Sequence, residues 1–127
     1  MFTGIISKIG RVRSTTNDGA RIEIEVPGTS GFTEGASVAC SGVCLTVTSH
    51  GDDWFAADVS SETLGCTTVR QWVAGTPLNI ERPLKIGDEL GGHMVLGHVG
   101  GVGAISARAM DGGSIRLTVE APTEIMR

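Results

Sequence analysis

The thiols of this sequence are among its side chains best suited to chemistry. They belong to Cys40, Cys44 and Cys66, an odd number that cannot all pair within one chain. A cysteine is a nucleophile as its thiolate, but the commonest role of a free cysteine is that of a small buried apolar residue. Nothing in the sequence indicates an oxidising compartment, so we expect free thiols and a cytoplasmic protein.

The imidazoles of His93 and His98 are the second candidate groups, and both lie in a glycine-rich stretch. Histidine transfers protons near neutral pH and is a common metal ligand. A metal site would need further ligands nearby, so we expect none here. Both residues can equally be turn or surface histidines. Of the two, we favour His98 as a group that handles protons or contacts a ligand.

Carboxylates and hydroxyls complete the candidates. Asp58 and Glu62 flank a serine-containing segment, where they either contact a ligand or merely support a strand end and a helix N-terminus. Ser37 and Thr46 lie in β-prone runs, in which both residue types are ordinary. The residue types alone leave both interpretations open.

Short strands must position these residues, because β-prone runs alternate with glycine-rich turns along the chain. Residues 21–26 alternate apolar and charged side chains, which predicts a strand with one solvent-facing side. Such runs cover residues 5–13, 21–26, 35–40, 43–48, 54–59 and 78–82. Residues 60–64 begin with good N-cap residues, which predicts one short helix ending by Gly65. We therefore predict an all-β fold with a closed antiparallel barrel of about six strands.

The composition excludes several classes of function. The net charge is −4 and the pI about 5.2, without a basic cluster, which argues against a nucleic-acid partner. No apolar run is long enough to span a bilayer and no secretory leader is evident, so we expect no membrane association. A length of 127 residues suits one domain with an appendage.

An internal repeat explains the appendage. A shift of 93 positions pairs Met1 with Met94, Gly4 with Gly97, Gly10 with Gly103, Val12 with Ile105, Ile22 with Ile115, Ile24 with Leu117 and Val26 with Val119. We expect a second copy of the first hairpin to begin near Met94, in one register without a gap. This divides the chain into a barrel, residues 1–90, and an incomplete second repeat, residues 91–127. The alternative is a chance match of glycine-rich β sequence.

Five separated motifs give the chain a resemblance to the riboflavin synthase family along nearly its whole length. They are MFTGI at residues 1–5, GVCLTV at 42–47, Asp58 with ETL at 62–64, NIER at 79–82, and GGH at 91–93 with GH at 97–98. The resemblance implies six-stranded Greek-key barrels in tandem. This chain would then hold one barrel with a short helix, followed by the first hairpin of a truncated second barrel.

The resemblance further implies a transferase that needs no metal or redox cofactor. In the implied reaction, two molecules of 6,7-dimethyl-8-ribityllumazine dismutate to riboflavin and 5-amino-6-ribitylamino-pyrimidinedione. It implies a homo-oligomer, a trimer at full length or a dimer for this fragment, with a possible association with lumazine synthase. A non-catalytic lumazine- or flavin-binding module, an inactive half-enzyme and a plain interaction barrel are the alternatives.

Matching positions carry the family's functional residues to this sequence. His98, Ser37 and Cys44 would be catalytic, and Cys44, Leu45 and Thr46 would line the lumazine ring, with Ser37 near the same mouth. Asp58, Val59, Ser60, Ser61, Glu62 and Thr63 would form the wall and entrance. Gly4, Ile5, Ile6, Gly97, His98 and Val99 would reach the site of a neighbouring subunit. Ser41, Gly65 and Gly100 depart from the family's usual asparagine, basic residue and aspartate, and the last two remove charges.

Overall fold

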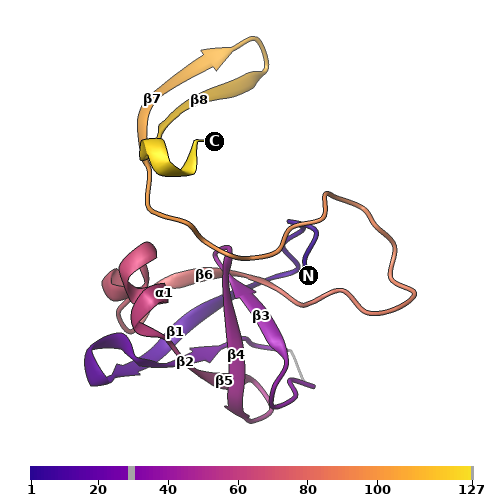
Figure 1. The fold of residues 1–127 in the computed structure, drawn as a ribbon. Coiled ribbons are helices and arrows are strands. Elements are labelled where there is room, and N and C mark those ends of the chain that lie inside the picture. Colours follow the sequence, from indigo (N-terminus) through magenta and orange to yellow (C-terminus); the bar gives the residue numbers. More distant parts are fainter. Residues whose placement is uncertain (29–30, 127) are drawn as a thin grey trace.

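The computed structural model describes residues 1–28 and 31–126, which form a barrel followed by a separate hairpin (Figure 1). The barrel strands are β1 (Lys8–Thr16), β2 (Arg21–Glu25), β3 (Ser37–Cys40), β4 (Val43–His50), β5 (Trp54–Asp58) and β6 (Pro77–Glu81). The hairpin strands are β7 (Ala104–Asp111) and β8 (Ser114–Glu120). The helix α1 (Ser61–Cys66) and the 3₁₀ turns η1 (Asn17–Gly19), η2 (Val69–Gln71) and η3 (Thr123–Ile125) complete the fold.

The six barrel strands close in the order β1-β2-β5-β4-β3-β6, with every neighbouring pair antiparallel. This arrangement confirms the predicted Greek-key barrel with one short helix. Closure places β1 beside β6, so that Lys8 near the start of the barrel sequence pairs with Ile80 near its end. No helix in the described part of the chain is long and apolar enough to cross a membrane.

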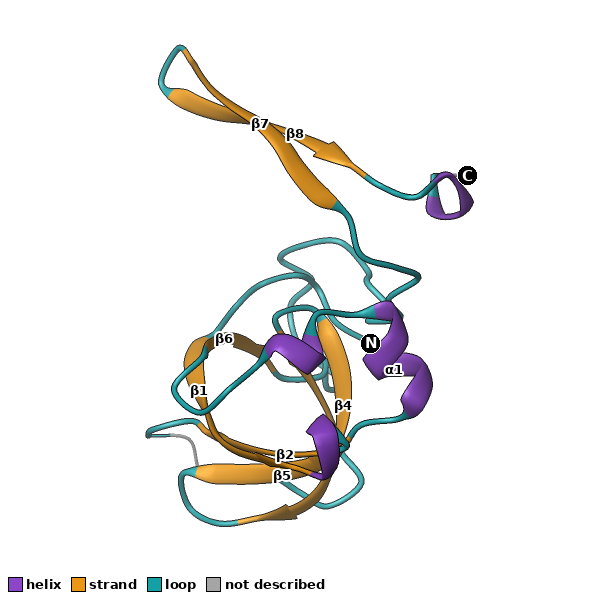
Figure 2. Ribbon diagram, turned by 90° about the vertical axis from the view of Figure 1, so that its left-hand side faces the viewer, coloured by secondary structure: helices purple, strands orange, loops and turns teal. Residues whose placement is uncertain are grey.

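The core lies inside the barrel, because alternate strand residues point inward. Ile22 and Ile24 of β2 are fully buried, as is Phe55 of β5. Phe32 packs against Phe55 with 4.6 Å between their ring centroids, an ordinary tilted aromatic contact. Figure 2 looks into this barrel and shows α1 lying beside β4.

Most element bounds differ from the sequence prediction by one to three residues. The first strand begins at Lys8 and not at residue 5. The chain turns earlier, at Gly4, which has φ +81°. Residues before that turn pair elsewhere, with Phe2 forming an isolated bridge to Val95. The helix runs to Cys66, one residue beyond the predicted end.

The helix α1 starts and stops for local reasons. The Ser60 hydroxyl accepts a hydrogen bond from the backbone N–H of Thr63 at 3.1 Å, which satisfies one free donor of the first turn. At the other end, the Thr67 hydroxyl donates to the Thr63 carbonyl at 2.6 Å. Leu64 turns into the core, which leaves the opposite side of the helix free to line a site.

The hairpin β7–β8 repeats the first hairpin, down to its irregularity. Strand β1 has a β-bulge between Val12 and Ser14, and β7 has one between Ile105 and Ala107, 93 positions later. The second strands are offset by 95 positions and not by 93. Thr15 pairs with Ile22 in the first hairpin, and its equivalent Arg108 pairs with Leu117 in the second. The predicted single register without a gap is therefore wrong. The hairpin tip of the second copy is two residues longer, and a shift of two keeps side chains on the same face.

Glycine occupies the same tight place in both copies. A Cβ on Gly10 would lie 2.9 Å from the Glu25 carbonyl oxygen, and one on Gly103 would lie 2.6 Å from that of Glu120. Real Cβ atoms do not approach a backbone oxygen so closely, so both positions require glycine. This shared constraint supports a true structural repeat.

The second hairpin stands apart from the barrel in both views (Figures 1 and 2). Ile105, Leu117 and Val119 are 63%, 51% and 61% exposed, although their counterparts in the first hairpin are buried. Among the described residues, β7 and β8 pair only with each other, so both outer edges of the hairpin are open. In the described part of the chain, the second repeat comprises the predicted hairpin.

Candidate functional site

The candidate site is a cavity of about 270 Å³ between the start of β4, the helix α1 and the segment 96–99. Its walls are formed by Val43, Cys44, Glu62, Thr63, Cys66, Thr67, Leu96, Gly97, His98 and Val99. Ligand pockets typically enclose about 300–1,000 Å³. The cavity therefore suits part of a small organic ligand.

Strand β4 presents Cys44 to this cavity because of its alternation. Val43 and Leu45 are buried and Cys44 is half-buried, so Cys44 faces outward from the barrel core. The helix supplies Glu62, Thr63 and Cys66, and Cys66 lies on the face of the other two because it follows them by four and three residues. A thiol from the strand and a thiol from the helix thus line one cavity.

The third wall folds back onto its own barrel at Gly97. The backbone N–H of Cys44 donates to the Gly97 carbonyl at 3.4 Å, and Gly97 has φ +80°. A Cβ on Gly97 would lie 3.0 Å from both the Cβ of Cys44 and the ring of Phe2. His98 and Val99 follow directly and line the cavity of their own barrel, where the resemblance led us to expect contact with a neighbouring subunit.

The cavity combines the groups that a flat heteroaromatic ligand requires. Val43, Leu96 and Val99 offer apolar surface for a ring, while hydroxyls and thiols can bond to ring heteroatoms. His98 is exposed and supplies an imidazole that can take or give a proton. Within residues 1–28 and 31–126, no three histidine, cysteine or carboxylate side chains come together as metal ligands would.

Six of the residues predicted for the site meet at this cavity. They are Cys44, Glu62, Thr63, Gly97, His98 and Val99. Val43, Cys66, Thr67 and Leu96 also line the cavity and were not predicted from the sequence. The position of Cys66 has a sequence signal, since it follows Glu62 by one helical turn. Leu96 has none, because its place depends on how the chain folds back at Gly97.

The residues expected beside Cys44 are divided between the core and the outer surface. Leu45 is 3% exposed and belongs to the barrel core, whereas Thr46 points outward and is exposed. Neither residue lines the cavity. Ser37 pairs with Thr46 and lies at a second cavity of about 110 Å³, where Arg82 and Lys85 are also found.

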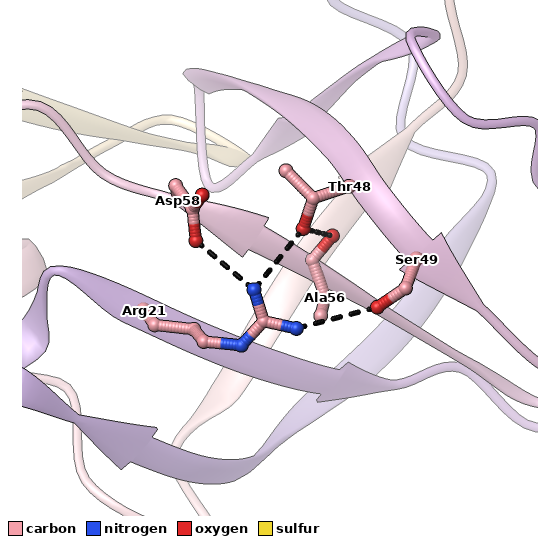
Figure 3. A network of polar contacts seen from close by, with 5 residues as sticks. All are labelled: Arg21, Thr48, Ser49, Ala56 and Asp58. Atoms are coloured by element: carbon pink, nitrogen blue, oxygen red, sulfur yellow. Dashed lines mark hydrogen bonds and ion pairs between the residues drawn. The ribbon is translucent and has the colours of Figure 1, made fainter.

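Asp58 is engaged in a polar network on the outside of the barrel (Figure 3). Its carboxylate accepts a hydrogen bond from the Arg21 guanidinium at 3.1 Å. The same guanidinium lies 3.5 Å from the Thr48 hydroxyl and 3.4 Å from the Ser49 hydroxyl. The Asp58 side chain is 65% exposed, so this ion pair contributes little stability, about 0–1 kcal/mol.

The remaining predicted residues surround the cavity without lining it. Val59 is buried in the core, Ser60 caps α1, and Ser61 is the first, exposed residue of the helix. Gly4, Ile5 and Ile6 lie before β1 and are exposed. The Ile5 side chain is next to Gly91, on the segment that leads to the cavity wall.

Cys40 differs from the other two thiols. It is fully buried in the barrel core, whereas Cys44 and Cys66 are half-buried at the cavity. Burial, with a smaller contribution from nearby Cys44, raises the pKa of the Cys40 thiol far above its ordinary value. Cys40 is therefore a neutral packing residue at physiological pH.

The barrel matches a known family in sequence. The sequence model of the family described as "Lumazine binding domain" matches residues 3–83, which include the six barrel strands and α1. The chain belongs to the lumazine binding domain family.

Within that family, the chain is similar to curated riboflavin synthases. It is 44% identical to the riboflavin synthase of Brucella abortus over 133 aligned positions, which cover 98% of this chain and 66% of the relative. It is 39% identical to that of Mycobacterium tuberculosis, covering 100% of this chain and 65% of the relative. Identity to that of Chlamydia muridarum is 39%, covering 84% and 55%. The chain thus spans between about half and two thirds of these relatives.

Solved structures show the same fold. A crystal structure of LumP complexed with 6,7-dimethyl-8-(1'-D-ribityl) lumazine superposes with a TM-score of 0.75 at 21% identity, covering 98% of this chain and 71% of LumP. A structure of LumP complexed with riboflavin gives a TM-score of 0.78 at 20% identity, covering 99% and 70%. At this identity, the likeness establishes the fold.

Proposed function

We propose that this chain is a riboflavin synthase polypeptide that binds 6,7-dimethyl-8-ribityllumazine in the cavity between β4, α1 and residues 96–99. In the reaction, one lumazine donates a four-carbon unit to a second one. The products are riboflavin and 5-amino-6-ribitylamino-pyrimidinedione, and no external oxidant or reductant is consumed. The observation that carries the proposal is that Cys44 and His98, from two distant motifs, line one cavity in a member of this family.

The cavity supports both parts of the proposed chemistry. Two reactants must be held in a fixed orientation, and apolar walls with a few polar groups provide such positioning. An acidic methyl proton must also be removed and a proton delivered to the departing amine, which suits the imidazole of His98 as general base and acid. We assign this proton transfer to His98 and a ring contact to Cys44. The catalytic role of Ser37 rests on the family resemblance, since Ser37 lines the second cavity.

We further propose that the chain works as a homo-oligomer. The two open edges and the exposed apolar face of the β7–β8 hairpin support this, because such a strand pair is marginal alone. We propose a trimer for a full-length protein and a dimer for these 127 residues. The division into residues 1–90 and 91–127, the cytoplasmic location and the association with lumazine synthase are also proposals, the last resting on the family resemblance alone.

One titration tests the proposed function. The purified chain is mixed with 6,7-dimethyl-8-ribityllumazine, and ligand fluorescence and riboflavin formation are followed together. Binding with riboflavin formation supports the enzyme, and binding without product supports a non-catalytic lumazine-binding module. Absence of binding at millimolar ligand would reject the site.

Paired histidine variants then test the assigned role. We expect His98→Gln to lower the rate of riboflavin formation about 100-fold or more while the lumazine Kd changes little. His93→Gln is the matched control, because His93 lies five residues away and does not line the cavity. Equal rates in the two variants would exclude His98 as the proton-transfer group.

A further inference from the structure

A buried carboxylate in the barrel holds the amino-terminal segment of the chain. Glu81, the last residue of β6, is 6% exposed and is the only buried charged side chain among the described residues. Its Oε1 atom accepts three hydrogen bonds: from the Thr3 backbone N–H at 2.6 Å, the Gly4 backbone N–H at 3.1 Å and the Thr3 hydroxyl at 3.1 Å. Bonds to an ionised acceptor are about twice as strong as neutral ones.

The held segment in turn carries the stretch that leads to the cavity wall. Phe2 and Val95 exchange two backbone hydrogen bonds, of 2.8 and 2.9 Å. The His93 backbone N–H donates to the Thr3 carbonyl at 3.1 Å. A Cβ on Gly92 would lie 2.3 Å from that carbonyl oxygen, so the two stretches run in direct backbone contact.

The contact continues to the cavity. Phe2 is 1% exposed, and its ring packs so close to Gly97 that a Cβ there would lie 3.0 Å from it. Two residues beyond Val95, Gly97 accepts the hydrogen bond from Cys44, and His98 follows on the cavity wall. Glu81 does not line the cavity, yet an unbroken series of contacts joins its carboxylate to the residues that do.

We infer that Glu81 is a positioning residue for the ligand cavity, acting through Thr3–Gly4 and the Phe2–Val95 pair to hold residues 96–99 against Cys44. This role rests on the proposed lumazine site for its ligand-binding consequence. Its structural consequence is independent of any ligand. Without the carboxylate, the Thr3 and Gly4 amides lose their acceptor, and the amino-terminal segment and the cavity wall loosen together.

Hydrogen exchange and ligand titration of Glu81 variants test the inference. In Glu81→Ala we expect the Val95 and Cys44 amides to exchange at least about tenfold faster, while the Val47 amide, bonded within the barrel, keeps its rate. The lumazine Kd should rise by about tenfold or more. Glu81→Gln keeps one oxygen acceptor, so its changes in amide exchange and in Kd should be smaller than those of Glu81→Ala. If Glu81→Ala fails to fold, the Glu81→Gln measurements test the inference.

Asp53→Asn is the matched control, because the Asp53 carboxylate also accepts a backbone N–H, that of Gly28, in a loop away from the cavity. A purely structural role for Glu81 would move the thermal midpoint without moving the Kd. The Glu81 variants should instead raise the lumazine Kd, and they should raise it more than Asp53→Asn does at a similar loss of thermal stability. Unchanged Val95 and Cys44 exchange in both Glu81 variants would overturn the inference. A wild-type chain that binds no lumazine would reject the proposed function and leave the exchange result to decide the role of Glu81.

Discussion

Gly97 and Cys44 approach each other closely at the wall of the cavity, where the Cys44 backbone N–H donates to the Gly97 carbonyl at 3.4 Å. A Cβ on Gly97 would lie 3.0 Å from the Cβ of Cys44, and the φ of +80° disfavours any side chain at this position. Two distant motifs, GVCLTV and GH, therefore meet at Gly97. Both the crowding around this residue and its backbone conformation favour glycine there. The cavity depends on this approach.

We predict that Gly97→Ala weakens lumazine binding by about tenfold or more, because the added methyl group pushes His98 and Val99 away from Cys44. The measurement is a fluorescence titration with 6,7-dimethyl-8-ribityllumazine. Gly113→Ala is the control, because nothing lies within 4 Å of a Cβ there and its φ is not left-handed. Equal affinities of the two variants would contradict this account of the wall.

We predict that the three thiols differ in reactivity in the folded protein. Cys44 and Cys66 are half-buried at the cavity and should react with iodoacetamide, whereas fully buried Cys40 should not. Saturating lumazine should slow the reaction of both cavity thiols. Mass spectrometry of the labelled chain, with and without ligand, counts the modified positions. Rapid labelling of Cys40 under native conditions would contradict its place in the core.

We predict that alkaline pH destabilises the fold through Cys40. Burial raises the pKa of this thiol in the folded state above its unfolded value of about 8.5, so the unfolded chain loses its proton first. The free energy of unfolding should then fall as pH rises above about 8.5. Denaturant unfolding between pH 7 and 10 measures this slope. Cys40→Ala should flatten it, and an unchanged slope in this variant would contradict the prediction.

We predict that the two equivalent glycines differ in their effect on stability. Gly10→Ala forces a methyl group against the Glu25 carbonyl within the closed barrel, which should cost about 1–3 kcal/mol of unfolding free energy. Gly103→Ala creates the same collision with Glu120 in the separate hairpin. Both tryptophans, Trp54 and Trp72, lie in residues 1–90, so their fluorescence reports barrel unfolding. That transition should shift for Gly10→Ala alone.

The sequence predicted the barrel well, because its inward-facing residues alternate along each strand. Ile22 and Ile24 show this pattern and are fully buried. The register of the second hairpin could not be predicted from the alternation of apolar residues, since a shift of two residues leaves that alternation unchanged. The start of β1 was also missed, because residues 5–7 are β-prone, yet they only lead from the turn at Gly4 into the strand, which begins at Lys8.

The site was predictable in its motifs and less so in its geometry. Cys44, Glu62, Thr63 and His98 were identified from motif positions and lie together. Ser37 lies at another cavity, since neither the resemblance nor strand propensity specifies where a strand residue sits around a barrel. The role inferred for Glu81 has no signal in sequence periodicity. It depends on three hydrogen bonds that join residues about 78 positions apart.

The bulge and the glycine contact of the first hairpin recur in β7–β8, around which the described residues close no barrel. The two features are therefore determined by local sequence, within about twenty consecutive residues in each copy. Closure of the first barrel is a different kind of event, since it joins Lys8 to Ile80 and must overcome the entropy of a long loop. In folding time, the hairpin should form early and closure late, which leaves the β1 and β6 edges open until the last step.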